Sequence, residues 1–272
     1  MSNSRRNAII AIAFLVILVP NFVAAQSKRS NRKGEFYFSW GYNKEWYTRS
    51  NLRIVQPELG NNYTFKNVRA HDNPGWDKGI FDRAMTIPQY NYRIGYFFNK
   101  AKGLAIEINF DHTKYIIDHQ QLRYKGRMNN KPVDETVNWN EDEGFYYFLN
   151  NGANFLLFNI VKRWELYQLP NEKIKIDILG KAGVGPVIPH VENQIFGEKN
   201  DPGFQIGGWN TGVEGAIKAT FFNTVYLELA NKLDYARYSH LKVYKGTARQ
   251  AFGSYQIILN LGITIPTGKK VQ

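Results

Sequence analysis

The stretch IPQYNYRIGYFFNKAKGLAIEINFDHTKY, residues Ile87–Tyr115, decides the fold class. Apolar and polar residues alternate along Tyr90–Phe98 and again along Leu104–Phe110, and such period-two alternation is typical of strands with one apolar and one polar face. The link Asn99–Gly103 is polar and ends in glycine, as a tight hairpin loop does. With their flanking residues, both strands exceed the roughly 9–11 residues that a tilted strand needs to cross a bilayer. The stretch therefore predicts one hairpin of a closed membrane barrel.

Six further segments have strand-like patterns, so we predict an all-β, up-and-down antiparallel barrel of about eight strands. The six lie at about Glu35–Trp46, Gly144–Val161, Lys173–Ile188, Gly203–Thr220, Val225–Tyr238 and Ala251–Ile265. Short links alternate with longer ones, and Tyr47–Met85 and Ile117–Glu143 are the longest. Short periplasmic turns and long external loops are typical of outer-membrane barrels. In the first long link, Tyr63–Arg69 is a candidate additional strand at the rim, which the sequence leaves open.

Both ends of the chain are expected to lie outside the barrel. Arg5 and Arg6 precede an apolar run at Ala8–Val19, and the small residues Val23–Ala25 follow, so residues 1–25 predict a cleaved secretory signal peptide. A retained membrane helix is the alternative, but the apolar run is shorter than the roughly 20 residues such a helix needs. We expect a basic tail at 26–34, the barrel at 35–266 and a polar tail at 267–272.

Composition limits the chemistry and the partners. The chain has no cysteine, which excludes disulfides and thiolate catalysis. Its net charge of +12 is concentrated partly in lysine and arginine near both ends, which predicts either solvated termini or attraction to anionic lipid headgroups. Export makes nucleic acid a poor partner. We expect a monomer in the cell outer membrane, in contact with its lipid and lipopolysaccharide, with an unidentified extracellular ligand or protein as a further partner.

Alternation alone leaves open which face of the barrel points outward, because a soluble lipocalin-like barrel has its apolar face inside. The polar face carries charges of both signs, and an eight-stranded barrel is just wide enough for side chains to fill it. Unpaired buried charges are costly, so we expect opposite charges to pair in the lumen. The predicted lumen network consists of Arg93, Glu107, Asp111, Lys175, Asp177, Lys181, Glu214, Lys218 and Glu228.

The pattern resembles the small eight-stranded outer-membrane barrel superfamily of the OmpA/OmpX type, over roughly Glu35–Pro266. Two segments, FYFSWGYNKEWY (36–47) and ARQAFGSYQIILNLG (248–262), are also similar to uncharacterised Bacteroidetes outer-membrane proteins. The resemblance is architectural and implies no catalytic motif. The chain departs from many such barrels because its last strand ends at Ile265–Pro266 without a terminal aromatic residue.

Two kinds of chemistry remain as alternatives. Resemblance to lipid A deacylases would require a serine near a histidine, and Ser239–His240 is the nearest pair; adjacent strand residues point to opposite faces, so they would need a bulge to meet. Histidines and carboxylates that could bind a metal occur in the long links, at His71, Asp72, Asp77, Asp111, His112, Asp118 and His119. Their spacing is not diagnostic, and we predict no catalytic residue, metal or cofactor. The expected function is a plugged outer-membrane barrel with a structural or surface-binding role, with a lipid-modifying enzyme or a narrow channel as alternatives.

Overall fold

The computed structural model describes residues 32–76, 88–149, 152–170 and 173–270. The predicted signal peptide (1–25) lies outside them. The described residues form seventeen antiparallel strands and one short 3-10 helix, Pro57–Leu59. No helix in these residues is long and apolar enough to cross a membrane.

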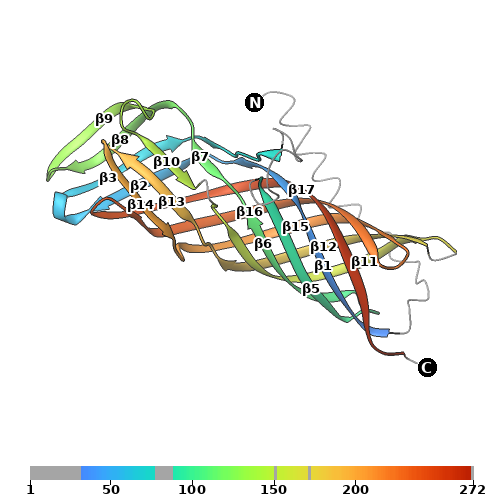
Figure 1. The fold of residues 1–272 in the computed structure, drawn as a ribbon. Helices are drawn as coiled ribbons and strands as arrows, with labels where there is room; N and C mark the ends of the chain where they lie inside the picture. The colour runs from blue at the N-terminus through green and yellow to red at the C-terminus, as the bar shows by residue number, and fades with distance from the viewer. Residues whose placement is uncertain (1–31, 77–87, 150–151, 171–172, 271–272) are drawn as a thin grey trace.

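Eight long strands close into a ring. They are β1 (Arg32–Tyr47), β5 (Tyr90–Asn99), β6 (Leu104–His112), β11 (Phe155–Gln168), β12 (Ile174–Pro186), β15 (Gly208–Phe221), β16 (Val225–Val243) and β17 (Gly246–Lys270). Each pairs antiparallel with the next, and β17 pairs back with β1 over almost the whole length of β1. The ring order follows the chain order, so this part is an up-and-down barrel (Figure 1).

The expected total of eight strands is too low, because the long links also form strands. Nine shorter strands lie in them: β2 (Ser50–Gln56), β3 (Asn61–Val68), β4 (Ala70–His71), β7 (Tyr115–Ile117), β8 (Gln120–Met128), β9 (Lys131–Trp139), β10 (Tyr146–Leu149), β13 (His190–Ile195) and β14 (Glu198–Phe204). The candidate strand at 63–69 thus largely coincides with β3, which pairs with β2 and β8. The predicted strand Gly144–Val161 is instead divided between β10 and β11.

Strand bounds also correct the predicted tails. Strand β1 begins at Arg32, and β17 continues to Lys270, where it pairs with Arg32. Residues 32–34 and 267–270 therefore belong to the barrel wall, because each supplies the backbone hydrogen bonds that the other needs.

The nine shorter strands stand together at one end of the barrel, at the upper left of Figure 1. There β2, β3, β8 and β9 continue the sheet beside β17, and β4, β7, β10, β13 and β14 form the facing wall. We call these strands, with residues 236–252 of β16 and β17, the extension. The barrel's opposite end carries the three short turns.

The barrel exposes its apolar side chains. Outward positions of its strands are large and apolar, and many are about half exposed, among them Ile94, Ile106, Ile108, Phe158, Ile160, Val213, Ile217, Leu227, Leu229, Leu233, Leu259, Leu261 and Ile263. Inward positions are mainly polar or small. This arrangement excludes the lipocalin-like alternative, in which the apolar face is inside. Closure also pairs every barrel strand on both edges, as a lipid environment requires.

Glycine makes room inside the barrel at one position in particular. Gly95 on β5 lies opposite Tyr37 on β1, and a Cβ added to Gly95 would lie 2.2–2.5 Å from atoms of the tyrosine ring. The space lets Tyr37 lie across the lumen, where its hydroxyl donates to Glu107 at 2.8 Å. The absence of a side chain at Gly95 therefore allows Tyr37 to reach from the barrel wall to the polar interior.

Candidate functional site

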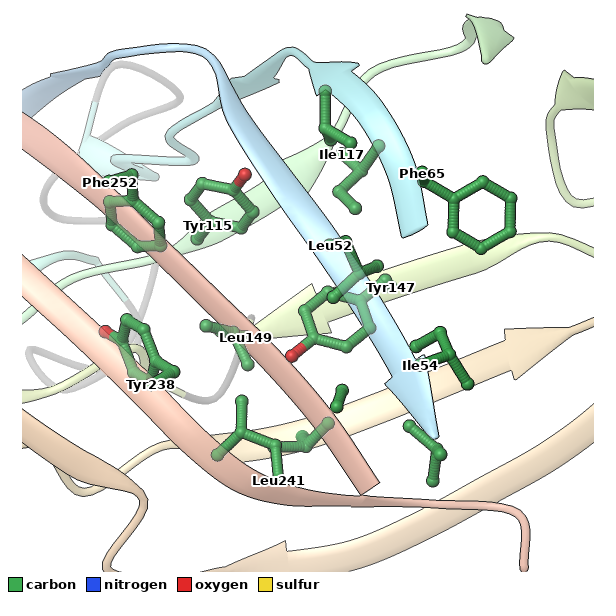
Figure 2. Packing of buried hydrophobic residues seen from close by; sticks show 14 of the residues in the cluster. Leu52, Ile54, Phe65, Tyr115, Ile117, Tyr147, Leu149, Tyr238, Leu241 and Phe252 are labelled. Atoms are coloured by element: carbon green, nitrogen blue, oxygen red, sulfur yellow. The ribbon is translucent and has the colours of Figure 1, made fainter. Parts of the chain in front are cut away.

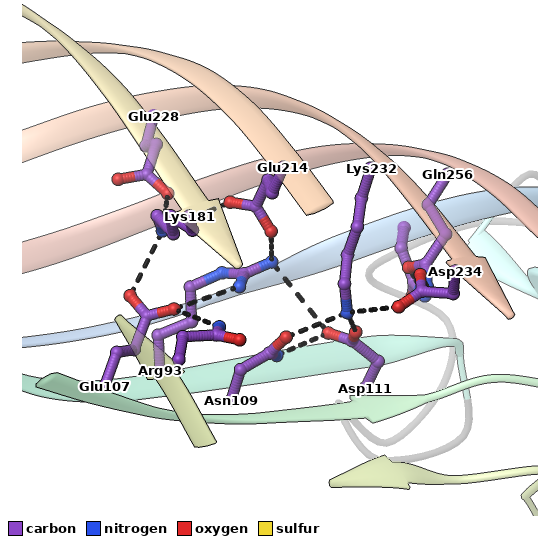
Figure 3. A network of polar contacts seen from close by, with 12 residues as sticks. Arg93, Glu107, Asn109, Asp111, Lys181, Glu214, Glu228, Lys232, Asp234 and Gln256 are labelled. Carbon is purple, nitrogen blue, oxygen red and sulfur yellow. Dashed lines mark hydrogen bonds and ion pairs between the residues drawn. The ribbon is translucent and has the colours of Figure 1, made fainter. Parts of the chain in front are cut away.

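The centre of the barrel is filled by a cluster of five charged side chains. The Arg93 guanidinium contacts Glu214 at 3.0 Å and Glu107 at 3.5 Å. The Lys181 ammonium contacts Glu107 at 3.1 Å, Glu214 at 3.1 Å and Glu228 at 2.8 Å (Figure 3). All five are almost completely buried. Each cation thus bridges carboxylates from several strands, and we call these residues the central cluster.

A second cluster lies nearer to the extension and joins the first through Arg93. Asp111 is 3.9 Å from Arg93 and pairs with Lys232, which also contacts Asp234 at 3.2 Å. Gln256 donates to Asp234 at 2.9 Å (Figure 3). We call these residues the upper cluster. It continues the polar contacts along the lumen from the central cluster toward the extension, so opposite charges are paired in both clusters.

A third cluster closes the lumen near the short turns. The Arg163 guanidinium donates to Glu35 at 2.6 Å, and Lys100 lies 3.4 Å from the same carboxylate. Arg163 also stacks over the ring of Phe97, with its central carbon 3.9 Å from the ring centre. An arginine held by a carboxylate on one side and an aromatic face on the other is a rigid plug at this end.

The remaining predicted lumen residues, Lys175, Asp177 and Lys218, lie toward the short-turn end of the barrel. Lys175 contacts Asp177 at 3.3 Å. Lys218 is buried and lies over the ring of Tyr226, 3.7 Å from its centre, with the ring of Tyr37 at 5.3 Å. The structure therefore places eight of the nine predicted residues among the buried groups and leaves Lys175 partly exposed.

The sequence prediction omitted several members of these clusters. Lys232 and Asp234 were omitted although they continue the inward set of Glu228 at two-residue spacing, so the alternation itself could have identified them. Glu35 and Arg163 are separated by 128 positions along the chain. Only closure of the barrel brings that pair together, and periodicity carries no signal of it.

Above the charged clusters the interior becomes apolar. Inside the extension, the rings of Tyr115 and Phe252 stack with centres 4.4 Å apart, and Phe65 meets Trp139 edge-on at 5.0 Å. Figure 2 shows this packing between the extension's two walls. We call it the extension core, and its buried members include Leu52, Ile54, Phe65, Tyr115, Ile117, Trp139, Phe145, Tyr147, Leu149, Tyr238, Leu241 and Phe252. Burial raises the pKa of the Tyr147 phenol well above its usual range.

The structure does not assemble a nucleophile from Ser239 and His240. A bulge does occur here, since the β16–β17 register shifts between Tyr238 and Leu241 and His240 has a φ of 59°. The His240 ring, however, lies 3.3 Å from Arg249, and no hydrogen bond joins it to Ser239 among the described residues. A serine without a base in reach is not activated.

The histidines and carboxylates that were considered as metal ligands are dispersed. His71 and Asp118 meet at 2.6 Å, whereas Asp72 accepts a hydrogen bond from Lys44 at 3.2 Å. His112 contacts Asn154 at 2.8 Å. His119 lines a hollow of about 250 Å³ beside His71, Asp111 lies in the upper cluster, and Asp77 falls outside the described residues.

A different group with metal-ligand chemistry occurs on β13 and β14. The ligand atoms of His190, Glu192 and Asp201 lie within 4.8 Å of one another. His190 and Asp201 pair with each other through Nε2 at 3.0 Å, whereas Nδ1 of His190 is buried without a hydrogen-bond partner among the described residues.

No protein-family model matches the sequence, and no curated protein matches it significantly. Solved structures with a similar fold include Ail, the attachment invasion locus protein of Yersinia pestis, with 12% identity, a TM-score of 0.33, and coverage of 86% of this chain and 99% of that one. The outer membrane protein OprG from Pseudomonas aeruginosa has 10% identity, a TM-score of 0.39 and coverage of 88% and 99%. The outer membrane protease OmpT from Escherichia coli has 11% identity and a TM-score of 0.38, with coverage of 90% of this chain and 100% of that one. These similarities are too low to transfer any role.

Proposed function

We propose that this chain is an integral outer-membrane β-barrel whose lumen is closed and whose extension stands outside the cell as a structural or ligand-binding surface. The observation that carries the proposal is that the interior is filled at two levels. Charged clusters fill the barrel itself, and the extension core fills the space above them. Such an interior leaves the exterior of the extension as the surface available to partners.

The exterior of the barrel supports the membrane location. Its outward side chains are apolar, and aromatic residues border that apolar band where the extension begins. There Trp46 stacks on Tyr255 at 5.7 Å, and Trp209 lies 5.8 Å from Tyr235. Aromatic side chains of this kind favour the interface between lipid and water. Only a lipid environment makes so many half-exposed apolar side chains favourable.

Electrical recordings test the closed lumen. Purified protein inserted into planar bilayers should give no steady conductance, with a wide porin as the positive control. Water-filled channels belong to barrels of about 16–18 strands, whereas this ring has eight. A stable, ohmic pore in the unmodified protein would overturn the proposal.

The absence of cysteine provides a clean test of orientation. Single-cysteine variants Lys131→Cys, at the exposed start of β9, and Lys102→Cys, in the exposed β5–β6 turn, form a matched pair. On intact cells a membrane-impermeant maleimide should label the first and reach the second only after the envelope is permeabilised. The reverse pattern would place the extension in the periplasm.

A further inference from the structure

We propose that the outer wall of the extension carries a phosphate-binding site, a basic hollow on β3 and β8 that takes the phosphorylated headgroups of the surrounding outer-leaflet lipid. The inference rests on the proposed orientation of the extension. We call the site the basic hollow and define it by Arg49, Lys66, Arg69 and Arg123, which line it together with amide side chains.

The basic hollow is a defined depression with a fixed backbone. Its volume is about 490 Å³, and all four basic side chains are exposed. Gln120 bonds both ways with the backbone of Arg69, accepting from its N–H at 3.1 Å and donating to its carbonyl at 2.8 Å. These bonds hold the ends of β3 and β8 together, so the positive charges converge on one place rather than on a flexible loop.

The charge in this region is not balanced by the protein. Among the described residues, Arg49, Lys66 and Arg69 form no ion pair. Asp134 is shared, since it binds Arg123 at 2.5 Å and Lys125 at 3.4 Å. Three convergent cations without a carboxylate leave a positive potential that an external anion would neutralise.

Strand register places more positive charge beside the hollow. Arg249 on β17 is the direct cross-strand partner of Arg53 on β2. The β3–β8 pairing ends at Phe65 with Tyr124, and the next residues, Lys66 on β3 and Arg123 on β8, both line the hollow. Like charges directly opposite in a sheet are destabilising, and a bound anion between them removes that cost. This like-charged pair beside the hollow indicates a surface adapted to anions.

The position of the hollow identifies the source of the anion. Arg49 follows the exposed interfacial residue Trp46 by three positions, roughly 10 Å along the chain. On β16, Arg237 follows the interfacial Tyr235 by two positions. The basic residues therefore begin just above the aromatic border, at the depth where lipid phosphates lie. A phosphorylated lipid can place its acyl chains against the barrel and its phosphate in the hollow at the same time.

The test measures binding of bisphosphorylated lipid A to the full chain in mixed micelles. The triple variant Arg49→Gln/Lys66→Gln/Arg69→Gln removes the unpaired cations of the hollow. Lys131→Gln/Lys199→Gln/Lys242→Gln is the matched control, because it removes the same charge from exposed positions elsewhere on the extension. Each lysine or arginine near an anionic surface contributes about a factor of five, so the hollow variant should bind roughly a hundredfold more weakly. The control should stay within about twofold of the unmodified protein.

Two further binding measurements decide the outcome. Dephosphorylated lipid A should bind the unmodified protein and the hollow variant alike, and inorganic phosphate at equal concentration should not displace the lipid. Equal loss in both triple variants would show only non-specific charge attraction and would overturn the site. Full displacement by inorganic phosphate would overturn the lipid as its source. Heat-modifiable migration on gels verifies that each variant folds. If the triple hollow variant does not fold, the single Lys66→Gln variant replaces it. Cysteine labelling reports the orientation of the extension separately.

Discussion

Substitution of Lys181 by methionine should destabilise the barrel more than any other single loss of a lysine in the chain. Methionine keeps the length and the apolar stem of the side chain and removes only the ammonium. That group lies 2.8–3.1 Å from three carboxylates, those of Glu107, Glu214 and Glu228. Arg93 still serves the first two, but within the described residues Lys181 is the only ion-pair partner of Glu228.

The magnitude follows from these distances. At 3 Å and an effective dielectric constant of about 20, one ion pair gives roughly 5 kcal/mol of attraction. Several kcal/mol per ion are offset by the loss of hydration, so the whole cluster is worth far less than the sum of its pairs. Removal of one partner is different, because Glu228 would stay buried without compensation. We therefore expect a loss of about 3–5 kcal/mol in the free energy of unfolding.

Urea unfolding in short-chain lipid vesicles, followed by tryptophan fluorescence, measures this loss. Lys199→Met on the exposed surface of β14 is the control and should change the free energy by less than about 0.5 kcal/mol. Addition of Glu228→Gln to Lys181→Met should recover about 1–3 kcal/mol, because the uncompensated charge is removed. A Lys181→Met barrel as stable as the control, or strictly additive effects in the double variant, would refute the ion-pair reasoning.

Three further predictions concern the extension and the barrel wall. Hydrogen bonds from Arg123 hold the pKa of Asp134 at about 2, below its ordinary 3.8. The stabilisation that Asp134 gives the β8–β9 hairpin should therefore be complete above about pH 4 and lost as the pH falls to about 2. Amide exchange, corrected for intrinsic rates, should show this loss in the unmodified chain and not in Asp134→Asn. Trp139→Ala should cost about 3–5 kcal/mol in the extension core while heat-modifiable migration of the barrel persists. Gly95→Ala should cost about 1–3 kcal/mol by urea unfolding, because its methyl group meets the Tyr37 ring, and the companion change Tyr37→Leu should reduce that cost.

The hairpin of β5 and β6 could be predicted from the sequence because one face of each strand meets the polar lumen and the other face meets the apolar exterior. Strands β5 and β6 pair with Arg93 opposite Asn109 and Gly95 opposite Glu107, so one face is polar in both strands. Alternation could not tell which face was outside. That depends on the environment of the whole ring, and only the exposed positions of Ile94, Ile106 and their neighbours decide it.

The strands of the extension were hidden from the same reasoning for a physical reason. Strand β9 has a single fully buried residue, Trp139, and most of its other side chains are exposed. A strand with both faces exposed to solvent shows no alternation of apolar and polar residues, so its composition resembles that of a loop. Its partner β8 fixes it through nine backbone pairings, from Gln120 with Trp139 to Met128 with Lys131. Main-chain pairing of this kind leaves little trace in side-chain pattern.

Strand β16 passes through two environments that require apolar side chains on opposite faces of the strand. Beside lipid, apolar side chains must point outward, and Leu229 and Leu233 do so. Above the lipid the exterior is water, so apolar side chains must point inward, as Leu241 does. All three have odd numbers, and an unbroken strand would keep them on one face. The bulge between Tyr238 and Leu241 adds one residue to β16 and exchanges its faces at the transition.

Strand β17 meets the same demand with its register intact. Its inward residues change from Phe252 in the extension to Gln256 and Asn260 in the barrel, while its outward residues change from Arg249 to Leu259. Strand β16 begins the same change by composition, because Tyr238 points inward and Arg237 outward before the bulge, and the bulge then brings Leu241 inside. The bulge in β16 accounts for the position of Leu241, because without it Leu241 would point to the outside of the extension and the extension core would lose a central side chain.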